Sequence, residues 1–508
     1  MKKIKSLLIS SLMTLIIIGM LSSCSSEKEN YLSSLPGESS LVFKFNTAQL
    51  VTKSNILDNP MVSGMLMQAD QHVPDALKDK FNEIKNDPSA AGIDLKKPLA
   101  IAVNLENLSA NPKPSVVGVM AISDVKKFDE LMKGVVESEP SITLSETNGI
   151  REVHIPEDEI NVAYNDSRIV LAFGENANTL VSQKAEESIL ANENFAEFAT
   201  SDKDFSMFMD YEWIMNATLE AQKSMNTPAS ISPQLMEYMK DMCVYGSLNF
   251  ETGKVVGDMK VYPSEEAKKY IDEFYVKPTD KLIGLLPENS YLGLNFAIKN
   301  YSECLRYLGE NERQQIEQIL QEYGISTELI DNVHGDILMG VYEDPNNAMI
   351  PGIVAAVECK DRTLFNKVKE MMQISEEGDM FVIPNMGYCV SYVDDVVVVS
   401  TQALYDQCLA SGSIRAWDKN WKGTAMGKAL AKGGVGIDFQ AISKNQLLAQ
   451  FSGNREAAMA LSILKQLETF TMQMENKLET SSELTLVNKS KNSLEQLIAI
   501  GIGAAMAQ

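Results

Sequence analysis

Leu35-Pro36-Gly37-Glu38-Ser39-Ser40-Leu41-Val42-Phe43 is the stretch that decides the fold, because the chain returns to the same pattern at Leu286-Pro287-Glu288-Asn289-Ser290-Tyr291-Leu292-Gly293-Leu294. In both places a Leu-Pro turn leads into an apolar run of strand length. One such pair is weak evidence, since turns that contain Pro often precede strands. The pair becomes informative when further matches follow in the same order.

Further blocks do recur in the same order, with a separation that falls steadily along the chain. They are Val116–Ile122 with Ile353–Cys359, Ile155-Pro156 with Ile383-Pro384, Met209-Asp210-Tyr211 with Ile437-Asp438-Phe439, and Asp258–Tyr262 with Glu483–Val487. The alternative is that these are generic strand and turn signals, but the shared order favours an internal duplication. We therefore predict two tandem homologous domains, 35–278 and 279–508, with a joint near Thr279–Leu285.

Each copy has the pattern of an α+β domain. Apolar runs such as Leu99–Leu105 and Ser115–Ile122 are separated by a polar loop, which predicts a hairpin. Amphipathic stretches such as Met61–Gln68, Asp75–Ile84 and Val125–Val136 predict helices between the strands. Hairpin-linked strands with intervening helices indicate a mainly antiparallel sheet, and we expect the helices to pack on one face of it.

The N-terminal residues predict secretion and attachment to a membrane. Lys2, Lys3 and Lys5 precede the apolar run Leu7–Leu21, which is too short for a comfortable membrane span and is typical of a secretory signal. Leu21-Ser22-Ser23-Cys24 resembles a bacterial lipobox, so we predict removal of residues 1–23 and lipid attachment at Cys24. The alternative is a transmembrane anchor with an incidental cysteine. The predicted tether, 24–34, reaches at most about 33 Å and would keep the folded body near the bilayer.

The sequence of the tether indicates in which membrane the protein is anchored. Ser26-Glu27-Lys28-Glu29 is short, polar and acidic, and resembles the export signals of surface-exposed lipoproteins in the Bacteroidetes. We therefore expect an outer-membrane lipoprotein of the cell envelope, either periplasmic or surface-exposed. The partner implied first is the membrane itself, through the N-terminal lipid.

Composition excludes one class of partner. The chain has 508 residues, a formal net charge of −24, 45% hydrophobic residues and 22% charged residues, as a globular protein of more than one domain has. Nucleic-acid binding needs clustered Lys and Arg, so the acidic balance argues against it. We interpret the acidic surface as a source of solubility.

Cysteine and histidine give no metal or cofactor prediction. Besides Cys24, the cysteines are Cys243, Cys304, Cys359, Cys389 and Cys408, with no CxxC spacing, so we expect mostly buried free thiols. A disulfide between Cys359 and Cys389 on neighbouring strands is the open alternative. His72, His154 and His334 lack partners at metal-ligand spacing.

No catalytic motif stands out. The chain has no GxSxG elbow, P-loop or GxGxxG after a strand. Asp394-Asp395 could pose as paired carboxylates, but Asp is the expected residue at a hairpin turn, which we favour. The glycines of Gly433-Gly434-Val435-Gly436 open a predicted strand, where close backbone approach explains them.

Trp417 and Trp421 are the best candidates for a contact patch. They lie four residues apart, between Arg415 and Lys422, so a helix would place both rings on one face. The alternative, which we favour, is a pair of rings that pins a loop to the core.

The lipobox, the Leu-Pro turn before the first strand and the duplicated α+β pattern together resemble an uncharacterised lipoprotein family of gut Bacteroidetes, whose members have no known function. The resemblance implies a location and a fold class, and it carries over no functional residue except Cys24.

Two hypotheses of function follow. The first is a lipid-anchored, non-enzymatic binding or scaffold protein that binds another envelope protein or a nutrient through a groove or an exposed sheet face. The second is a hydrolase with carboxylates from both copies in an inter-domain site. An exposed apolar patch would favour the first hypothesis, and convergent carboxylates in a deep cleft would favour the second.

Overall fold

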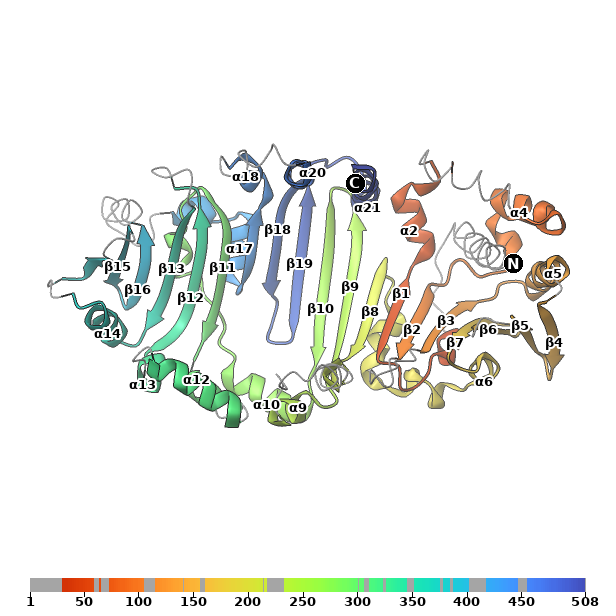
Figure 1. Cartoon of the computed structure of the whole chain (residues 1–508), viewed down its shortest axis with the longest axis horizontal. Helices are drawn as coiled ribbons and strands as arrows, with labels where there is room; N and C mark the ends of the chain where they lie inside the picture. Colours follow the sequence, from red (N-terminus) through yellow and green to blue (C-terminus); the bar gives the residue numbers. More distant parts are fainter. Residues whose placement is uncertain are drawn as a thin grey trace. The chain divides into compact units, whose positions relative to one another are not determined.

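The structure is a computed structural model with α+β architecture and antiparallel strand pairing (Figure 1). It describes residues 30–58, 64, 73–104, 115–139, 141–155, 160–212, 214–216, 233–299, 301–305, 310–322, 326–344, 351–374, 378–383, 387–401, 417–445 and 455–507. The predicted helix at Met61–Gln68 lies almost wholly outside these residues.

The chain separates into two compact units. Unit 1 comprises Met1–Ser230, Asp241–Glu251 and Asn492–Ala499, and unit 2 comprises Ile231–Lys240, Thr252–Lys491 and Ile500–Gln508. The long segment of unit 2 begins at Thr252, earlier than the predicted boundary between the sequence copies at 278/279. The physical reason is that the strand after Thr252 hydrogen-bonds along its length to a strand near the C-terminus.

Unit 1 is built on one antiparallel sheet. The described strands follow the order β9-β8-β1-β2-β3-β7-β6-β5-β4. Their bounds are β1 (Leu41–Phe45), β2 (Leu99–Asn104), β3 (Ser115–Ala121), β4 (Thr143–Thr147), β5 (Ile150–His154), β6 (Ile160–Tyr164), β7 (Arg168–Phe173), β8 (Phe205–Asp210) and β9 (Cys243–Glu251). The predicted hairpin of β2 with β3 is confirmed.

Helical segments pack on both faces of this sheet, so the expectation of helices on one face alone is wrong for unit 1. They are η1 (Asn30–Ser34), α2 (Thr47–Ser54), η2 (Ile56–Asp58), α4 (Asp75–Asn86), η3 (Pro88–Ala91), α5 (Val125–Ser138), α6 (Ala177–Ser182), η4 (Ala185–Glu187), η5 (Ile189–Ala191), η6 (Glu193–Phe195) and α7 (Ala196–Thr200). The cause is that β3 and β7 are apolar at both alternate sets of positions, so both faces must be covered.

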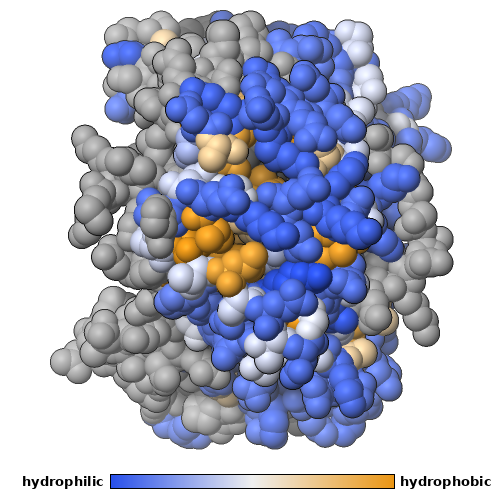
Figure 2. Space-filling view, turned by 90° about the vertical axis from the view of Figure 1, so that its right-hand side faces the viewer, coloured by the Kyte–Doolittle hydropathy of each residue, from blue (hydrophilic) through white to orange (hydrophobic). Residues whose placement is uncertain are grey.

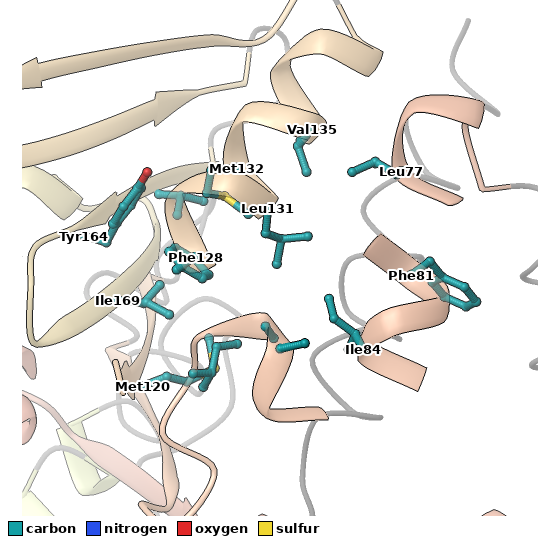
Figure 3. Close-up of a cluster of buried hydrophobic side chains, with 14 of the residues drawn as sticks. Leu77, Phe81, Ile84, Met120, Phe128, Leu131, Met132, Val135, Tyr164 and Ile169 are labelled. Carbon is teal, nitrogen blue, oxygen red and sulfur yellow. The ribbon is translucent and has the colours of Figure 1, made fainter. Parts of the chain in front are cut away.

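One covered face forms the core between α4, α5 and the strands (Figure 3). Leu131 and Val135 of α5 point toward Leu77 of α4, whereas Phe128 lies beside Tyr164 and Ile169 of the strands. The ring of Phe128 meets the ring of Tyr164 edge-on, with centroids 4.8 Å apart. The apolar positions of α5 recur at helical spacing, which is why this predicted helix forms.

The opposite face of unit 1 carries a buried lysine. Lys44 of β1 is 1% exposed, and its Nζ donates hydrogen bonds to the carbonyl oxygens of Phe198 at 2.5 Å and Ala199 at 3.0 Å. Both carbonyls belong to the last turn of α7, where carbonyl oxygens lack donors from a following helical turn. The Phe198 carbonyl also accepts from the Ser201 main-chain N–H at 3.3 Å. The Lys44 ammonium group therefore caps the C-terminal end of α7 by donating hydrogen bonds to main-chain carbonyls.

Unit 2 is also built on one antiparallel sheet. Its described strands follow the order β10-β19-β18-β17-β11-β12-β13-β16-β15-β14. Their bounds are β10 (Lys254–Tyr262), β11 (Ser290–Ile298), β12 (Val333–Tyr342), β13 (Gly352–Cys359), β14 (Met380–Val382), β15 (Tyr388–Val393), β16 (Val396–Thr401), β17 (Gly434–Asp438), β18 (Leu467–Met474) and β19 (Glu479–Leu486).

The helices of unit 2 flank this sheet, and α14 and α17 lie on opposite faces of it. They are α9 (Pro233–Met239), α10 (Glu265–Phe274), η7 (Ile283–Leu285), α11 (Tyr301–Cys304), α12 (Glu310–Glu322), α13 (Thr327–Ile330), α14 (Thr363–Met371), α16 (Asp418–Trp421), α17 (Ala425–Ala431), α18 (Phe439–Lys444) and α20 (Arg455–Leu464). The described chain ends with α21 (Ser493–Ala507), whose residues up to Ala499 are assigned to unit 1 and the rest to unit 2. Figure 1 shows α12 at one end of the long strands and α18 and α20 at the other. The buried Phe365 of α14 packs on the strands at the β15 end of the sheet, and Met426 and Leu430 of α17 pack on the other face.

A row of glycines explains how α17 approaches so closely. Gly436, Gly293 and Gly340 are cross-strand neighbours on β17, β11 and β12. A Cβ on Gly340 would lie 2.1 Å from Leu286 Cδ2, and one on Gly436 would lie 2.4 Å from Met426 Cγ. Close backbone approach is the use that the sequence predicted for the glycines at the start of β17.

Candidate functional site

The predicted lipid-attachment residue, Cys24, lies outside the described residues, as do His72, Trp213 and Cys408. Lipid attachment at Cys24 therefore stays a prediction. Among the helices of the described ranges, none combines the length and the apolar character that a membrane span requires.

Trp417 and Trp421 pack against the core of unit 2. Trp421 is 8% exposed, and its Nε1–H donates to the carbonyl oxygen of Leu286 at 2.8 Å. Trp417 is half-buried against the same apolar cluster, and its main-chain N–H donates to Gly284 at 3.1 Å. The two tryptophans thus fix the Leu-Pro segment that leads into β11. This is the structural role that we favoured from the sequence, a pair of rings that holds a loop against the core.

The helical layer beside Trp421 nevertheless forms a pocket of about 450 Å³, a size typical of small-molecule sites. Trp421, Ile283 and Ala431 give it an apolar floor, and Lys419, Lys422 and Lys428 stand at its edge. We call it the Trp421 pocket. Asp280, Asp418, Gly423 and Gly427 complete its lining.

The other face of the unit 2 sheet carries a second candidate surface. Strand register sets apolar side chains in two rows across five strands, β18, β17, β11, β12 and β13. The first row is Met472, Val435, Leu294, Met339 and Ala355, and the second is Phe470, Ile437, Leu292, Val341 and Ile353. We call these ten residues the open apolar face.

Several side chains of the open apolar face are accessible to solvent. Met339 is 45% exposed, Ile353 is 43% exposed and Met472 is 37% exposed, and the other seven residues are half-buried. In Figure 1 no helix of the described residues crosses the near side of these five strands between α12 and α18. Sheet faces normally alternate between apolar and polar when one side meets water, so an apolar water-facing side indicates a binding surface.

The surface elsewhere is more hydrophilic. Figure 2 faces the side of unit 1 that carries α5 and β4, and it shows a mainly hydrophilic surface with separated apolar areas. This agrees with the net charge of −24. In unit 2, exposed apolar side chains outside the open apolar face include Met371, Met372 and Val382.

The buried acidic cluster of unit 2 holds the predicted joint in place. Asp336 accepts hydrogen bonds from the Thr279 main-chain N–H at 3.0 and 3.1 Å, and from the Thr279 hydroxyl. Glu358 accepts from the Asp336 main-chain N–H at 2.7 Å and pairs with Lys281 at 2.6 Å. Burial raises the pKa of Asp336, against the effect of the Thr279 hydrogen bonds. Each of these contacts positions the segment that enters η7.

The other predicted candidates have structural roles. Asp394 and Asp395 have φ angles of 50° and 62° in the turn between β15 and β16, so the prediction of a turn is confirmed. Tyr392 donates to Asp395 at 2.7 Å across that turn. His154 and His334 are exposed on β5 and β12. Within the described ranges, no group of three or more His, Cys, Asp or Glu side chains could hold a metal ion.

Three described cysteines are buried free thiols, as the sequence predicts. They are Cys243, Cys359 and Cys389. Burial raises the pKa of Cys243 and of Cys359 to about 11, so both stay protonated at neutral pH. A protonated, buried thiol is a poor nucleophile.

The open apolar face is what sequence reasoning missed. The two rows were visible in part, because Leu292, Leu294, Val435 and Ile437 alternate along predicted strands. Alternation alone does not tell which face a helix covers, and here the glycine row selects the other face for α17.

The fold defines an α+β protein with antiparallel sheets and one open apolar face. The chain matches the family described as "Domain of unknown function (DUF4836)" over residues 31–398, and it belongs to this family. The match includes sequence on both sides of the predicted boundary at 278/279.

No curated protein matches the chain. Two crystal forms of TP0453 show a distant structural likeness. Form I has a TM-score of 0.27 and 10% identity over 50% of this chain and 89% of that chain. Form IV has a TM-score of 0.26 and 10% identity over 46% of this chain and 80% of that chain. At such TM-scores the likeness transfers neither fold details nor function.

Proposed function

We propose that this protein is a non-catalytic, lipid-anchored binding protein of the cell envelope, held at the outer membrane through Cys24, and that it docks another envelope protein on the open apolar face. The observation that carries the docking proposal is the exposure of Met339, Ile353 and Met472 in two apolar cross-strand rows. The N-terminal sequence supports the location.

The shape and chemistry of the face favour a protein partner. Five adjacent strands span about 19 Å, which suits the apolar side of a helix or a sheet. The main-chain groups beneath are paired within the sheet, so affinity has to come from side-chain packing. Met339 and Met472 add adaptable, polarisable contacts of the kind that protein-docking surfaces use.

We also propose that the two units arose by duplication. The strand after the Leu-Pro turn has the same neighbours in both units, as β8-β1-β2-β3-β7-β6-β5 corresponds to β17-β11-β12-β13-β16-β15-β14. This agreement supports our proposal that the units descend from one ancestral domain, in line with the repeated sequence blocks.

The test is a purification from detergent-solubilised membranes with two matched double variants. M339D/I353D places charges on the open apolar face, and M371D/V382D places the same charges on similarly exposed apolar residues outside it. All four side chains are solvent-exposed, so both variants should keep the thermal midpoint of the wild type. We expect one stoichiometric envelope protein to co-purify with the wild type and with M371D/V382D, and to be lost from M339D/I353D.

Two outcomes would contradict the docking proposal. One is a partner that stays bound to M339D/I353D. The other is a wild-type protein that is recovered without a stoichiometric partner, whether as a monomer or as an oligomer of itself by light scattering.

A further inference from the structure

We propose that the Trp421 pocket binds a small organic anion with an aromatic or aliphatic body, whose acidic group lies among Lys419, Lys422 and Lys428. This goes beyond the docking function, because the pocket belongs to the helical layer of α16, α17 and η7 on the covered side of the unit 2 sheet. The two sites therefore make independent predictions.

The floor of the pocket sets the apolar part of the ligand. Trp421 holds a fixed orientation because its Nε1–H is hydrogen-bonded to Leu286, so the indole offers a rigid surface. Ile283 and Ala431 extend that surface, and Gly423 leaves room beside it, since a Cβ there would meet nothing within 4 Å. A volume of about 450 Å³ is large enough for a bicyclic aromatic or a short aliphatic chain.

The edge of the pocket sets the charge of the ligand. Lys419, Lys422 and Lys428 are all exposed, so their ammonium groups can turn toward a bound anion. Asp280 and Asp418 also line the pocket, but each already takes part in an interaction of its own. Cation capture is disfavoured because three ammonium groups outnumber the two carboxylates.

The location is unusual for this chain. With 69 acidic and 45 basic residues, the surface as a whole repels anions. Three lysines from α16, the turn after it and α17 meet around one apolar floor. A local reversal of charge over a concave apolar surface is the combination that selects an amphipathic anion.

The experiment is isothermal titration of the full mature chain with 2-naphthoate and with its neutral analogue 2-naphthamide. The pocket variant K419Q/K422Q/K428Q is matched by K360Q/K444Q/K465Q, which removes the same charge from exposed lysines outside the pocket. These side chains are exposed, so both triple variants should fold, and thermal unfolding verifies it.

We expect one naphthoate per chain, with binding that weakens as salt is raised. Three exposed charge contacts of modest strength predict an affinity that is about tenfold weaker in the pocket variant and unchanged in the control. The neutral amide should bind about tenfold more weakly than naphthoate. The proposal is overturned if naphthoate does not saturate one site, if both triple variants bind it equally, or if the amide binds as tightly as the acid.

Discussion

Single residues decide which face of the unit 2 sheet is covered. Gly436, Gly293 and Gly340 form a cross-strand row in which a methyl group would collide with Leu286 or with Met426. The absence of side chains at these positions, more than any attraction, lets η7 and α17 approach the strands. The opposite face of β11, β12 and β17 is the open apolar face.

The glycine row predicts a clear mutational cost. Gly340→Ala would bring its Cβ to 2.1 Å from Leu286 Cδ2, so we expect a loss of about 1–3 kcal/mol in the free energy of unfolding. Urea unfolding followed by circular dichroism measures it. Gly503→Ala is the control, because nothing lies within 4 Å of that Cβ and alanine favours the helix α21. A Gly340→Ala variant as stable as the wild type would contradict the close packing.

One carboxylate gives a prediction about acid stability. Hydrogen bonds from Lys432 at 2.7 Å, Ser481 at 2.6 Å and Gln473 at 2.6 Å lower the pKa of Glu475 from 4.5 to about 2. A lowered native pKa adds stability that is present above pH 4.5 and is lost as the pH falls toward 2.

The variant Glu475→Gln should therefore unfold with a weaker pH dependence than the wild type over that acid window. The side chain is partly exposed, so we expect an effect of a few tenths of a kcal/mol, about what surface ion pairs contribute. Thermal midpoints measured at a series of acidic pH values test it. Parallel pH profiles for the two proteins would show that the Glu475 contacts do not persist in solution.

At the scale of elements, helices and strands whose apolar residues recur at regular spacing were predicted well. The sequence predicts a helix over Val125–Val136, and α5 runs from Val125 to Ser138 because four buried side chains repeat along one face. The strand β4, Thr143–Thr147, is not predicted. Its side chains are mostly exposed and polar, so it has no apolar alternation, and its strand state comes from pairing with β5.

The pattern also failed to assign faces. Runs such as Val396–Val399 are apolar at every position, so period alone does not tell which side meets a helix. Trp417 and Trp421 show the same limit, because their spacing permits either an exposed pair or a buried one. The bond from Trp421 to Leu286 depends on a contact between distant segments, which local pattern does not contain.

Neighbouring residues of β12 test the assignment of faces. Leu338 is fully buried against the helical layer, and Met339 points to the open apolar face. Leu338→Ala should lower the free energy of unfolding by about 2–5 kcal/mol, because it leaves a cavity in the core. Met339→Ala should change it by about 0.5 kcal/mol or less. Equal losses at the two positions, measured by urea unfolding, would show that both faces are buried.

At the scale of the whole molecule, the family match and the two compact units extend over most of the chain, whereas the proposed attachment to the membrane rests on one residue. Both units consist of antiparallel strands and helices (Figure 1), and the side that Figure 2 faces is mainly hydrophilic. The proposed location therefore depends on the N-terminal sequence and not on the folded units.

Cys24→Ala tests that dependence. Without a cysteine no acyl chain can be attached, so we expect the variant to lose its membrane association while both units keep their fold. Fractionation of cells expressing wild type and variant measures the distribution, and mass spectrometry of the wild-type N-terminus detects the lipid. Persistent membrane association of the variant, with an intact N-terminus, would instead support a transmembrane anchor.

The glycine row has a consequence for how this family can change over evolutionary time. Substitutions at Gly293, Gly340 and Gly436 are held in check by the fold itself, because each disturbs the layer beneath. Substitutions at Met339, Ile353 and Met472 meet no such constraint, since nothing in the core depends on their shape. On one side of the sheet the residues are therefore constrained by packing, and on the other side the sequence can change without loss of the fold. Relatives that diverge in partner should therefore share the glycines and differ in the three exposed residues.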